Sequence, residues 1–101
     1  MAKEKTKSDQ LYVLQCKDNK DSKIKVKIGV TSNIENRIKA LQTGNPNKIE
    51  LLFVEYRTNP TKAERYLHKC FAKKRQEGEW FEDLTLNEIR SRLMLFFDQD
   101  E

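Results

Sequence analysis

The chain has too few cysteines and histidines for a disulfide framework or a structural zinc site. It contains two cysteines, Cys16 and Cys70, and one histidine in 101 residues, and no CxxC pair occurs. Small secreted domains usually need several disulfides, and a structural zinc ion usually needs about four Cys or His ligands. We therefore expect a protein of the reducing cytoplasm.

Long apolar runs are also absent from the sequence. The segment Met1–Gln10 is mostly charged or polar and lacks the apolar centre of a signal peptide. No stretch approaches the roughly 18 apolar residues that a membrane-spanning helix needs. We expect no membrane partner, a disordered basic arm over residues 1–9, and an acidic, frayed end over residues 98–101.

The remaining residues, 10–97, are predicted to form one domain. Hydrophobic residues make up 37% of the sequence, which suits one small core, and no internal repeat or linker divides the chain. The net charge of +4 is modest, but seven basic residues and a single acid, Glu64, lie between Arg57 and Arg75. This segment is suited to a polyanion such as DNA, and its candidate contacts are Arg57, Lys62, Arg65, Lys69 and Lys73.

The first half of the domain has the pattern of a β-hairpin. Residues 11–16 and 24–30 are rich in apolar and β-favouring residues, and the polar residues 17–23 between them predict an exposed turn. Gly29 is expected to relax the backbone near the end of the second strand, where the chain must turn.

A helix over residues 33–43 is predicted directly after the hairpin. Ser32 and Glu35 have the spacing of a capping box, and Gly44 is placed to end the helix.

Another strand and two more helices are predicted in the second half. Residues 49–56 form the most continuous apolar run, so we expect a buried and central strand there. A helix is predicted over 61–75, and a third helix is predicted to begin at the capping box of Thr85 and Glu88.

Between these helices, residues 79–81 are expected to pack against the sheet as an extended stretch. The predicted order is β-β-α-β-α-α, which indicates a small α/β or α+β fold with one short sheet covered by helices.

Five side chains have the chemistry that phosphodiester hydrolysis needs. The guanidinium group of Arg37 can bind two phosphate oxygens at once, and the Glu64 carboxylate is suited to hold Mg²⁺ or Mn²⁺. The Tyr12 hydroxyl can position or activate a water molecule, because it both donates and accepts. Lys27 is either a general base or a phosphate-binding cation. His68, four residues after Glu64, either transfers a proton or braces that glutamate.

Each of these residues also has a structural interpretation. Glu64 has the spacing of a capping box with Thr61, and Tyr12 could simply pack in the sheet. Lys27 could belong to the solvent-facing side of a strand, and Trp80 is more typical of packing than of base stacking.

The sequence resembles the GIY-YIG nuclease superfamily. The motifs KIGVTSNIENRIKALQTGNP, AERYLH and GEWF follow Tyr12 in this order within residues 11–81, and KIG in place of YIG is typical of a phage- and virus-associated branch. The resemblance implies a three-stranded antiparallel sheet flanked by helices, and an endonuclease that cuts DNA with one divalent metal and no small-molecule cofactor. It implies a site made of Tyr12, Lys27, Gly29, Arg37 and the metal ligand Glu64.

Two other functions stay open at this stage. The first glycine, the histidine after the helix arginine and the late asparagine of the superfamily have no counterpart here, so the alternative is an inactive, nuclease-derived DNA-binding or regulatory module. A protein-interaction domain is the third hypothesis, because charges of both signs are mixed over much of the sequence. We expect a monomer or a homodimer.

Overall fold

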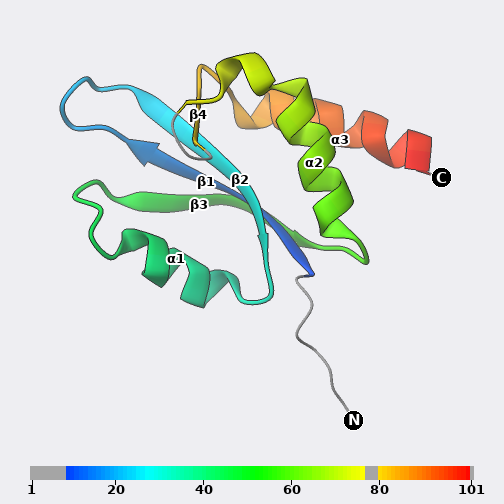
Figure 1. The fold of residues 1–101 in the computed structure, drawn as a ribbon, viewed down its shortest axis with the longest axis horizontal. Helices are drawn as coiled ribbons and strands as arrows, with labels where there is room; N and C mark the ends of the chain where they lie inside the picture. The colour runs from blue at the N-terminus through cyan, green and yellow to red at the C-terminus, as the bar shows by residue number, and fades with distance from the viewer. Residues whose placement is uncertain (1–8, 77–79, 101) are drawn as a thin grey trace, which may run out of the picture.

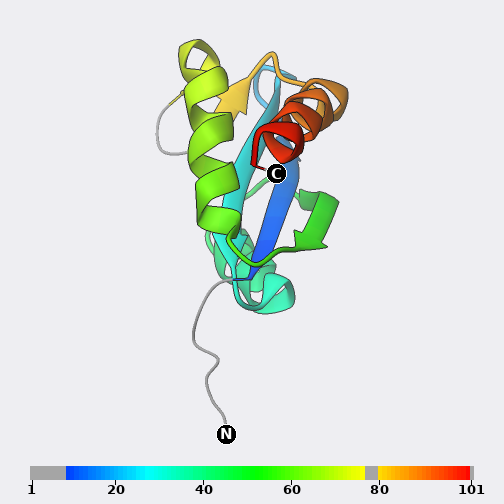
Figure 2. The same ribbon diagram turned by 90° about the vertical axis from the view of Figure 1, so that its right-hand side faces the viewer.

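The protein has an α+β fold in which a four-stranded antiparallel sheet lies between helices. The computed structural model describes residues 9–76 and 80–100. Helix α1 covers one face of the sheet, and helices α2 and α3 lie side by side on the other (Figures 1 and 2). The elements are β1 (Gln10–Lys17), β2 (Ile24–Thr31), α1 (Ile34–Gln42), β3 (Ile49–Tyr56), α2 (Pro60–Cys70), the 3₁₀ helix η1 (Ala72–Lys74), β4 (Trp80–Glu82) and α3 (Leu86–Asp100).

The predicted hairpin is confirmed. Strands β1 and β2 pair antiparallel over their whole length, from Gln10 opposite Thr31 to Lys17 opposite Ile24. In the turn, the side chain of Asp18 accepts a hydrogen bond from the backbone N–H of Lys20. This bond satisfies a backbone group that has no partner on a neighbouring strand.

The prediction that residues 49–56 form the central strand is wrong. The strand order is β3-β1-β2-β4. Strand β3 therefore lies at an edge of the sheet, and β1 is one of the two inner strands. Leu11 and Leu14 of β1 are fully buried, whereas Leu51 of β3 is 44% exposed. A run of apolar residues indicates a strand but does not tell how many neighbours that strand has.

The expected number of strands was three, and the structure adds a fourth. Strand β4 is only three residues long and pairs with β2 from Lys25 opposite Glu82 to Lys27 opposite Trp80. The extended stretch predicted at 79–81 is thus a short strand, although Glu79 lies outside the described residues. Three residues are too few to show the alternation that predicts a strand.

Helix α1 begins one residue later than the predicted capping box. Asn33, and not Ser32, is the N-cap, and its side chain accepts from the backbone N–H of Asn36 at 3.0 Å. Gly44, with φ of +81°, follows the helix in the left-handed conformation expected of a glycine at a helix end.

Helix α2 is shorter than predicted and starts differently. It begins at Pro60, so Thr61 lies inside the first turn and is not the N-cap. The helix ends at Cys70. The rest of the predicted span becomes a turn at Phe71, the 3₁₀ helix η1 and, at Arg75, an isolated β-bridge to Phe81. Its buried residues include Ala63 and Leu67, which lie on the stripe that faces the sheet.

Helix α3 starts at the predicted capping box. The Thr85 backbone donates to Glu88 Oε1 at 3.0 Å, and the Glu88 backbone donates to Thr85 Oγ1 at 3.2 Å. The hydrogen bond from Thr85, with the nearby Lys74 ammonium, holds the pKa of the Glu88 carboxyl below its ordinary value. The helix continues to Asp100, three residues past the domain boundary expected at 97. The arm over 1–8 and Glu101 lie outside the described residues.

Two apolar clusters hold the layers together. The larger one joins the sheet to α2 and α3, and the smaller one, around Tyr12 and Leu14, joins the sheet to α1. Both cysteines are free thiols. No helix within residues 9–76 and 80–100 is long and apolar enough to cross a membrane.

Replacing Thr85 should weaken the start of α3. We expect Thr85→Ala to lower the free energy of unfolding by about 1 kcal/mol, because the Glu88 backbone N–H loses its acceptor. Urea denaturation measures this loss. Ser91→Ala, at an exposed position inside the same helix, is the matched control and should cost nothing. Equal effects of the two substitutions would contradict this role of Thr85.

Candidate functional site

Tyr12 and Gly29 meet on the face of the sheet that α1 covers. They are opposite each other in the β1–β2 register, and the Tyr12 ring crosses the backbone of Gly29. A Cβ atom at position 29 would overlap with Tyr12 Oη, so no residue with a side chain fits there without a shift of the ring. Gly29 lies within β2, so the prediction that it relaxes a turn is wrong: the missing side chain is what matters.

Arg37 joins this pair from helix α1. Its Nε donates a hydrogen bond to Tyr12 Oη at 3.3 Å. Arg37 is otherwise exposed, whereas Tyr12 is 1% exposed. The tyrosine therefore anchors a guanidinium group that still faces solvent and can bind an anion.

Gln10 holds α1 in the position that this contact requires. Its Oε1 accepts a hydrogen bond from the backbone N–H of Ile34 at 2.8 Å, and the residue is only 5% exposed. The bond ties the start of β1 to the first turn of α1. Gln10 is not among the predicted site residues, because a polar residue at the start of a strand does not reveal a partner 24 positions away.

Lys27 lies on the same face as Gly29, two residues earlier in β2. The residue is 5% exposed, and its Nζ lies 5.7 Å from the centre of the Trp80 ring. A cation at this distance from an indole is attracted by the π electrons of the ring. Trp80 thus positions the Lys27 ammonium, a contact that the sequence analysis did not foresee.

Glu64 and His68 reach β2 from helix α2. His68 Nε2 lies 2.9 Å from the backbone oxygen of Ile28, and Glu64 Oε2 lies 4.0 Å from the same nitrogen. A carbonyl oxygen only accepts, so Nε2 carries a proton and donates to Ile28. The ring also packs edge-on against Phe81 at 5.2 Å. His68 is therefore held as a brace between the strand and the glutamate, and this nitrogen does not act as a base while the bond persists.

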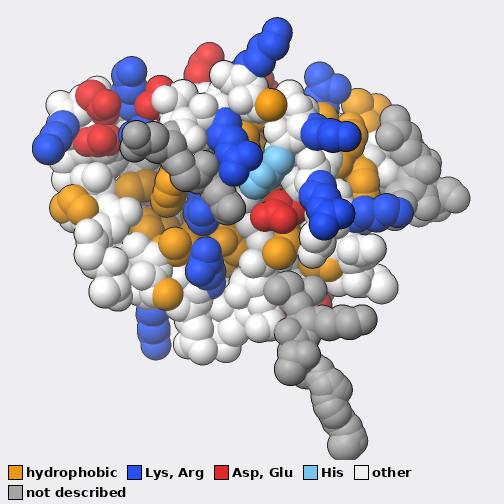
Figure 3. Space-filling view, viewed as in Figure 1, with side chains coloured by type: hydrophobic (Ala, Val, Ile, Leu, Met, Phe, Trp, Pro, Cys, Tyr) orange, Lys and Arg blue, Asp and Glu red, His pale blue; other side chains and the backbone are white. Residues whose placement is uncertain are grey.

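The two groups of residues converge on one segment of β2. Ile28 lies between Lys27 and Gly29, so α2 contacts the strand between two members of the first group. Strand β4 pairs only with Lys25–Lys27, and the edge of β2 beyond it receives His68 instead. Figure 3 shows the histidine beside an acidic side chain, with Lys and Arg side chains around them. We call this group the β2 site. It consists of the backbone of residues 27–29 and of five side chains, which are Tyr12, Lys27, Arg37, Glu64 and His68.

Four of the five predicted nucleic-acid contacts form one exposed stripe. Their spacing places them along one side of α2 and η1, and all four side chains are exposed. We call this the α2 stripe, and it consists of Lys62, Arg65, Lys69 and Lys73.

The fifth residue, Arg57, is placed differently. Its side chain is 15% exposed, lies 3.9 Å from Glu55 and stacks 5.4 Å from the Phe96 ring. These contacts attach the end of β3 to α3.

Glu64 is the carboxylate of the β2 site that could hold a metal ion. Among the residues described, no three His, Cys, Asp or Glu side chains gather into a metal site. Mg²⁺ often takes only one or two carboxylates from a protein and fills its other positions with water and substrate phosphate. The side chain of Glu64 is 20% exposed, so solvent and a phosphate can reach it. A single-glutamate site of that kind fits these residues.

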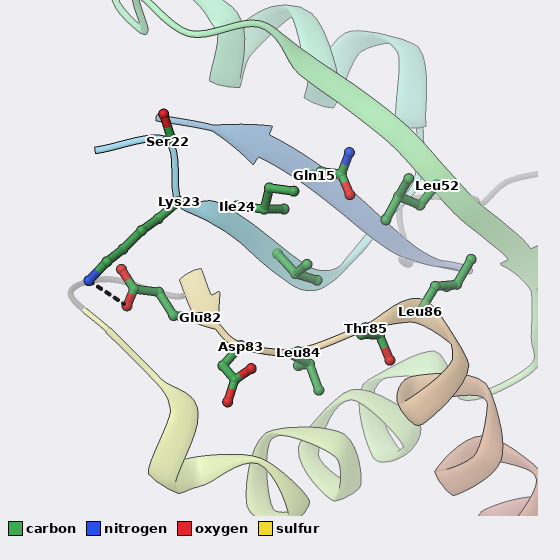
Figure 4. A pocket seen from close by; sticks show the side chains of 11 residues that line it. Gln15, Ser22, Lys23, Ile24, Leu52, Glu82, Asp83, Leu84, Thr85 and Leu86 are labelled. Atoms are coloured by element: carbon green, nitrogen blue, oxygen red, sulfur yellow. Dashed lines mark ion pairs between the residues drawn. The ribbon is translucent and has the colours of Figure 1, made fainter. Parts of the chain in front are cut away.

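A wider groove lies elsewhere on the molecule. Its volume is about 700 Å³, and it runs between the hairpin end of the sheet and the segment from β4 to α3. Figure 4 shows its lining, with Lys23 and Glu82 paired at one end. None of the predicted site residues lines this groove, so it is separate from the β2 site.

Comparison with known proteins gives one match. The family model described as T5orf172 domain matches residues 9–96. No curated protein matches the sequence, and no solved structure matches it.

Filling the space above Gly29 should destabilise the β2 site. We expect Gly29→Ala to lower the free energy of unfolding by about 1–3 kcal/mol, because the new methyl group meets the Tyr12 ring. Urea denaturation of the single and double variants measures the coupling. In a Tyr12→Leu background, which removes the ring, the cost of Gly29→Ala should shrink.

Gly44→Ala is the matched control for this measurement. A Cβ atom at position 44 has no other atom within 4 Å, so this substitution costs only the strain of an alanine in the left-handed conformation. Tyr12→Leu should therefore leave the cost of Gly44→Ala unchanged. The same cost of Gly29→Ala in both backgrounds would refute the steric explanation.

Proposed function

Because the chain belongs to the T5orf172 domain family, which is nuclease-like and associated with GIY-YIG-like domains in phage, we propose that it hydrolyses phosphodiester bonds of DNA. The observation that carries the proposal is the convergence of Tyr12, Lys27, Arg37, Glu64 and His68 on residues 27–29 of β2. They supply the cations, hydroxyl group and carboxylate that this reaction requires.

Arg37 binds the phosphate, and Lys27 adds positive charge beneath it. Arg37 presents an exposed guanidinium whose Nε is anchored on Tyr12, so its remaining N–H groups can contact two phosphate oxygens. Lys27 is held beside Trp80 and adds positive charge on the same face of the sheet. Fixed positive charge stabilises the negative oxygens that develop as the phosphorus is attacked.

Tyr12 positions the attacking water. A hydroxyl oxygen both accepts and donates, so Oη, which accepts from Arg37, is the group that would contact the water. His68 donates to Ile28 and keeps Glu64 at the edge of β2. Of the three candidate bases in the sequence analysis, Tyr12 is therefore favoured, and His68 acts as a positioning residue.

Glu64 would hold a divalent cation, Mg²⁺ or Mn²⁺, beside the bound phosphate. A metal ion in that place supplies Lewis-acid stabilisation of phosphate charge.

A DNA-binding module without catalysis is the second candidate function. It is favoured by the burial of Tyr12 and Lys27, which are 1% and 5% exposed and leave a substrate little access to their side chains. The α2 stripe would still contact phosphates, because its four side chains are exposed. This candidate predicts binding that survives the loss of Glu64.

DNA cleavage should depend on Glu64 and Arg37. We expect nicking of a supercoiled plasmid with Mg²⁺ or Mn²⁺, and a decrease of about 10²-fold or more in Arg37→Ala and Glu64→Gln, because each removes transition-state stabilisation. Gel electrophoresis over time measures the rate.

The matched controls for cleavage are Lys39→Ala and Glu35→Gln. Both are exposed residues of α1 that lie two positions from Arg37 and point to other sides of the helix. They should cleave at the wild-type rate. Nicking by wild type at no higher rate than by Glu64→Gln would reject the endonuclease and leave the binding module.

The α2 stripe should set the salt dependence of binding. We expect Arg65→Ala and Lys69→Ala each to lower the slope of log K against log salt by about 1, because each removes one phosphate contact. Fluorescence anisotropy between about 50 and 200 mM salt measures the slope. Arg90→Ala, an exposed arginine of α3 outside the stripe, is the control and should leave it unchanged. An unchanged slope in both stripe variants would contradict the assignment.

A further inference from the structure

A small hollow lies beside the β2 site on the α1 face of the sheet. Its volume is about 160 Å³, and it lies further along β2 toward the hairpin turn. Trp80, which contacts the Lys27 ammonium, forms part of its wall, so the hollow and the β2 site share a border. The six residues that line it are Cys16, Asp18, Lys25, Asn45, Asn47 and Trp80.

Two asparagines give the hollow fixed hydrogen-bond donors. Asn47 Oδ1 accepts from the backbone of Asn19 at 3.1 Å, and Asn45 Oδ1 accepts from the backbone of Asn47 at 2.9 Å. The first bond joins the β1–β2 turn to the segment between α1 and β3, and Figure 1 shows both at the same end of the molecule. Since both amide oxygens are held by backbone N–H groups, each asparagine turns its NH₂ group to the hollow. That of Asn45 also hydrogen-bonds the Cys16 thiol, so one of its two protons is left for a ligand, whereas Asn47 offers its whole NH₂ group.

Asp18 adds an acceptor to the same hollow. Its Oδ1 accepts from the backbone of Lys20 at 2.8 Å, and its Oδ2 lies 3.9 Å from Lys25 Nζ. A carboxylate has about four acceptor positions, so these contacts leave it able to accept a further hydrogen bond. Burial raises the pKa of the Cys16 thiol, so that part of the wall is uncharged. The hollow therefore combines an aromatic wall, donors and an acceptor.

The size of the hollow limits the ligand to one ring. A cavity of about 150 Å³ in another protein takes up one benzene molecule. A hollow of about 160 Å³ holds a six-membered ring, whereas the second ring of a purine would extend out of it into solvent. The base-pairing edge of a pyrimidine carries hydrogen-bond acceptors as well as a donor. The acceptors match the NH₂ groups of Asn45 and Asn47, and the donor matches the carboxylate of Asp18.

We propose that this hollow binds one unstacked pyrimidine base of a DNA strand whose phosphate lies at Arg37. Asn45, Asn47 and Asp18 are then specificity-determining residues, and Trp80 is the apolar wall against which the base lies. The proposal rests on the proposed DNA binding and adds a base preference to it.

The single tryptophan of the chain allows a direct test. Trp80 is the only tryptophan, so its emission reports on the hollow and on the adjacent Lys27 ammonium. The full chain is titrated with fluorophore-labelled, single-stranded oligo-dT and oligo-dA of equal length, and anisotropy of the label gives the overall affinity. We expect oligo-dT to quench Trp80 and to bind about 5-fold more tightly or better, and oligo-dA to bind with little quenching.

Asn47→Asp separates the hollow from general features of the strand. The new carboxylate still accepts from the Asn19 backbone but cannot donate to a base, so the fold is kept and the oligo-dT preference should disappear. This comparison is needed because flexible pyrimidine runs are often bound more readily for reasons unrelated to hydrogen bonding. Asn36→Asp, at an exposed position of α1, adds the same charge outside the hollow and should lower both affinities without changing their ratio.

Three outcomes would overturn the proposal. Equal affinity and equal quenching with both oligonucleotides would reject the pyrimidine pocket and leave DNA binding intact. A preference for oligo-dT that persists in Asn47→Asp would also reject it. Failure of anisotropy to detect binding of either oligonucleotide at low salt would reject both this inference and the proposed function.

Discussion

The close approach of the Tyr12 ring to the Gly29 backbone is the contact on which the β2 site depends. Only a residue without a side chain at position 29 lets the ring lie across β2. The ring then places Oη where Arg37 of α1 can donate to it, and the small apolar cluster fixes the helix above. The position of Tyr12 Oη, and with it the contact that orients the Arg37 guanidinium group, thus depends on the absence of a side chain at position 29.

The second constraint acts through the edge of the sheet. Because β4 ends its pairing at Lys27, the carbonyl of Ile28 is left for a side chain, and His68 takes it. Glu64 is then carried to the same edge by one turn of α2. The Glu64 carboxylate thus lies on the same helix as most cations of the α2 stripe, an arrangement suited to a metal ion and a phosphate.

Local patterns in the sequence were sufficient for elements whose partners lie nearby. Thr85 and Glu88 bond to each other, so their spacing alone located the start of α3. The same kind of pattern misplaced the start of α1 by one residue, since Ser32 and Asn33 can both cap a helix and only the fold selects between them. The edge position of β3, the short strand β4 and the bonds of Gln10 and His68 join distant parts of the chain, and no local pattern encodes them. The candidate side chains were found by type and spacing, whereas the role of Gly29 required the tertiary contact.

The edge strand β3 has a consequence for the behaviour of many copies in solution. Within the described part of the chain it has a neighbouring strand on one side only, so its outer backbone could template the addition of another chain. A second copy that paired along this edge would bring its own Glu50 and Glu55 beside those of the first copy. Two carboxylates in such a pair repel each other, and the strand thereby discourages the self-templated growth that leads to fibres.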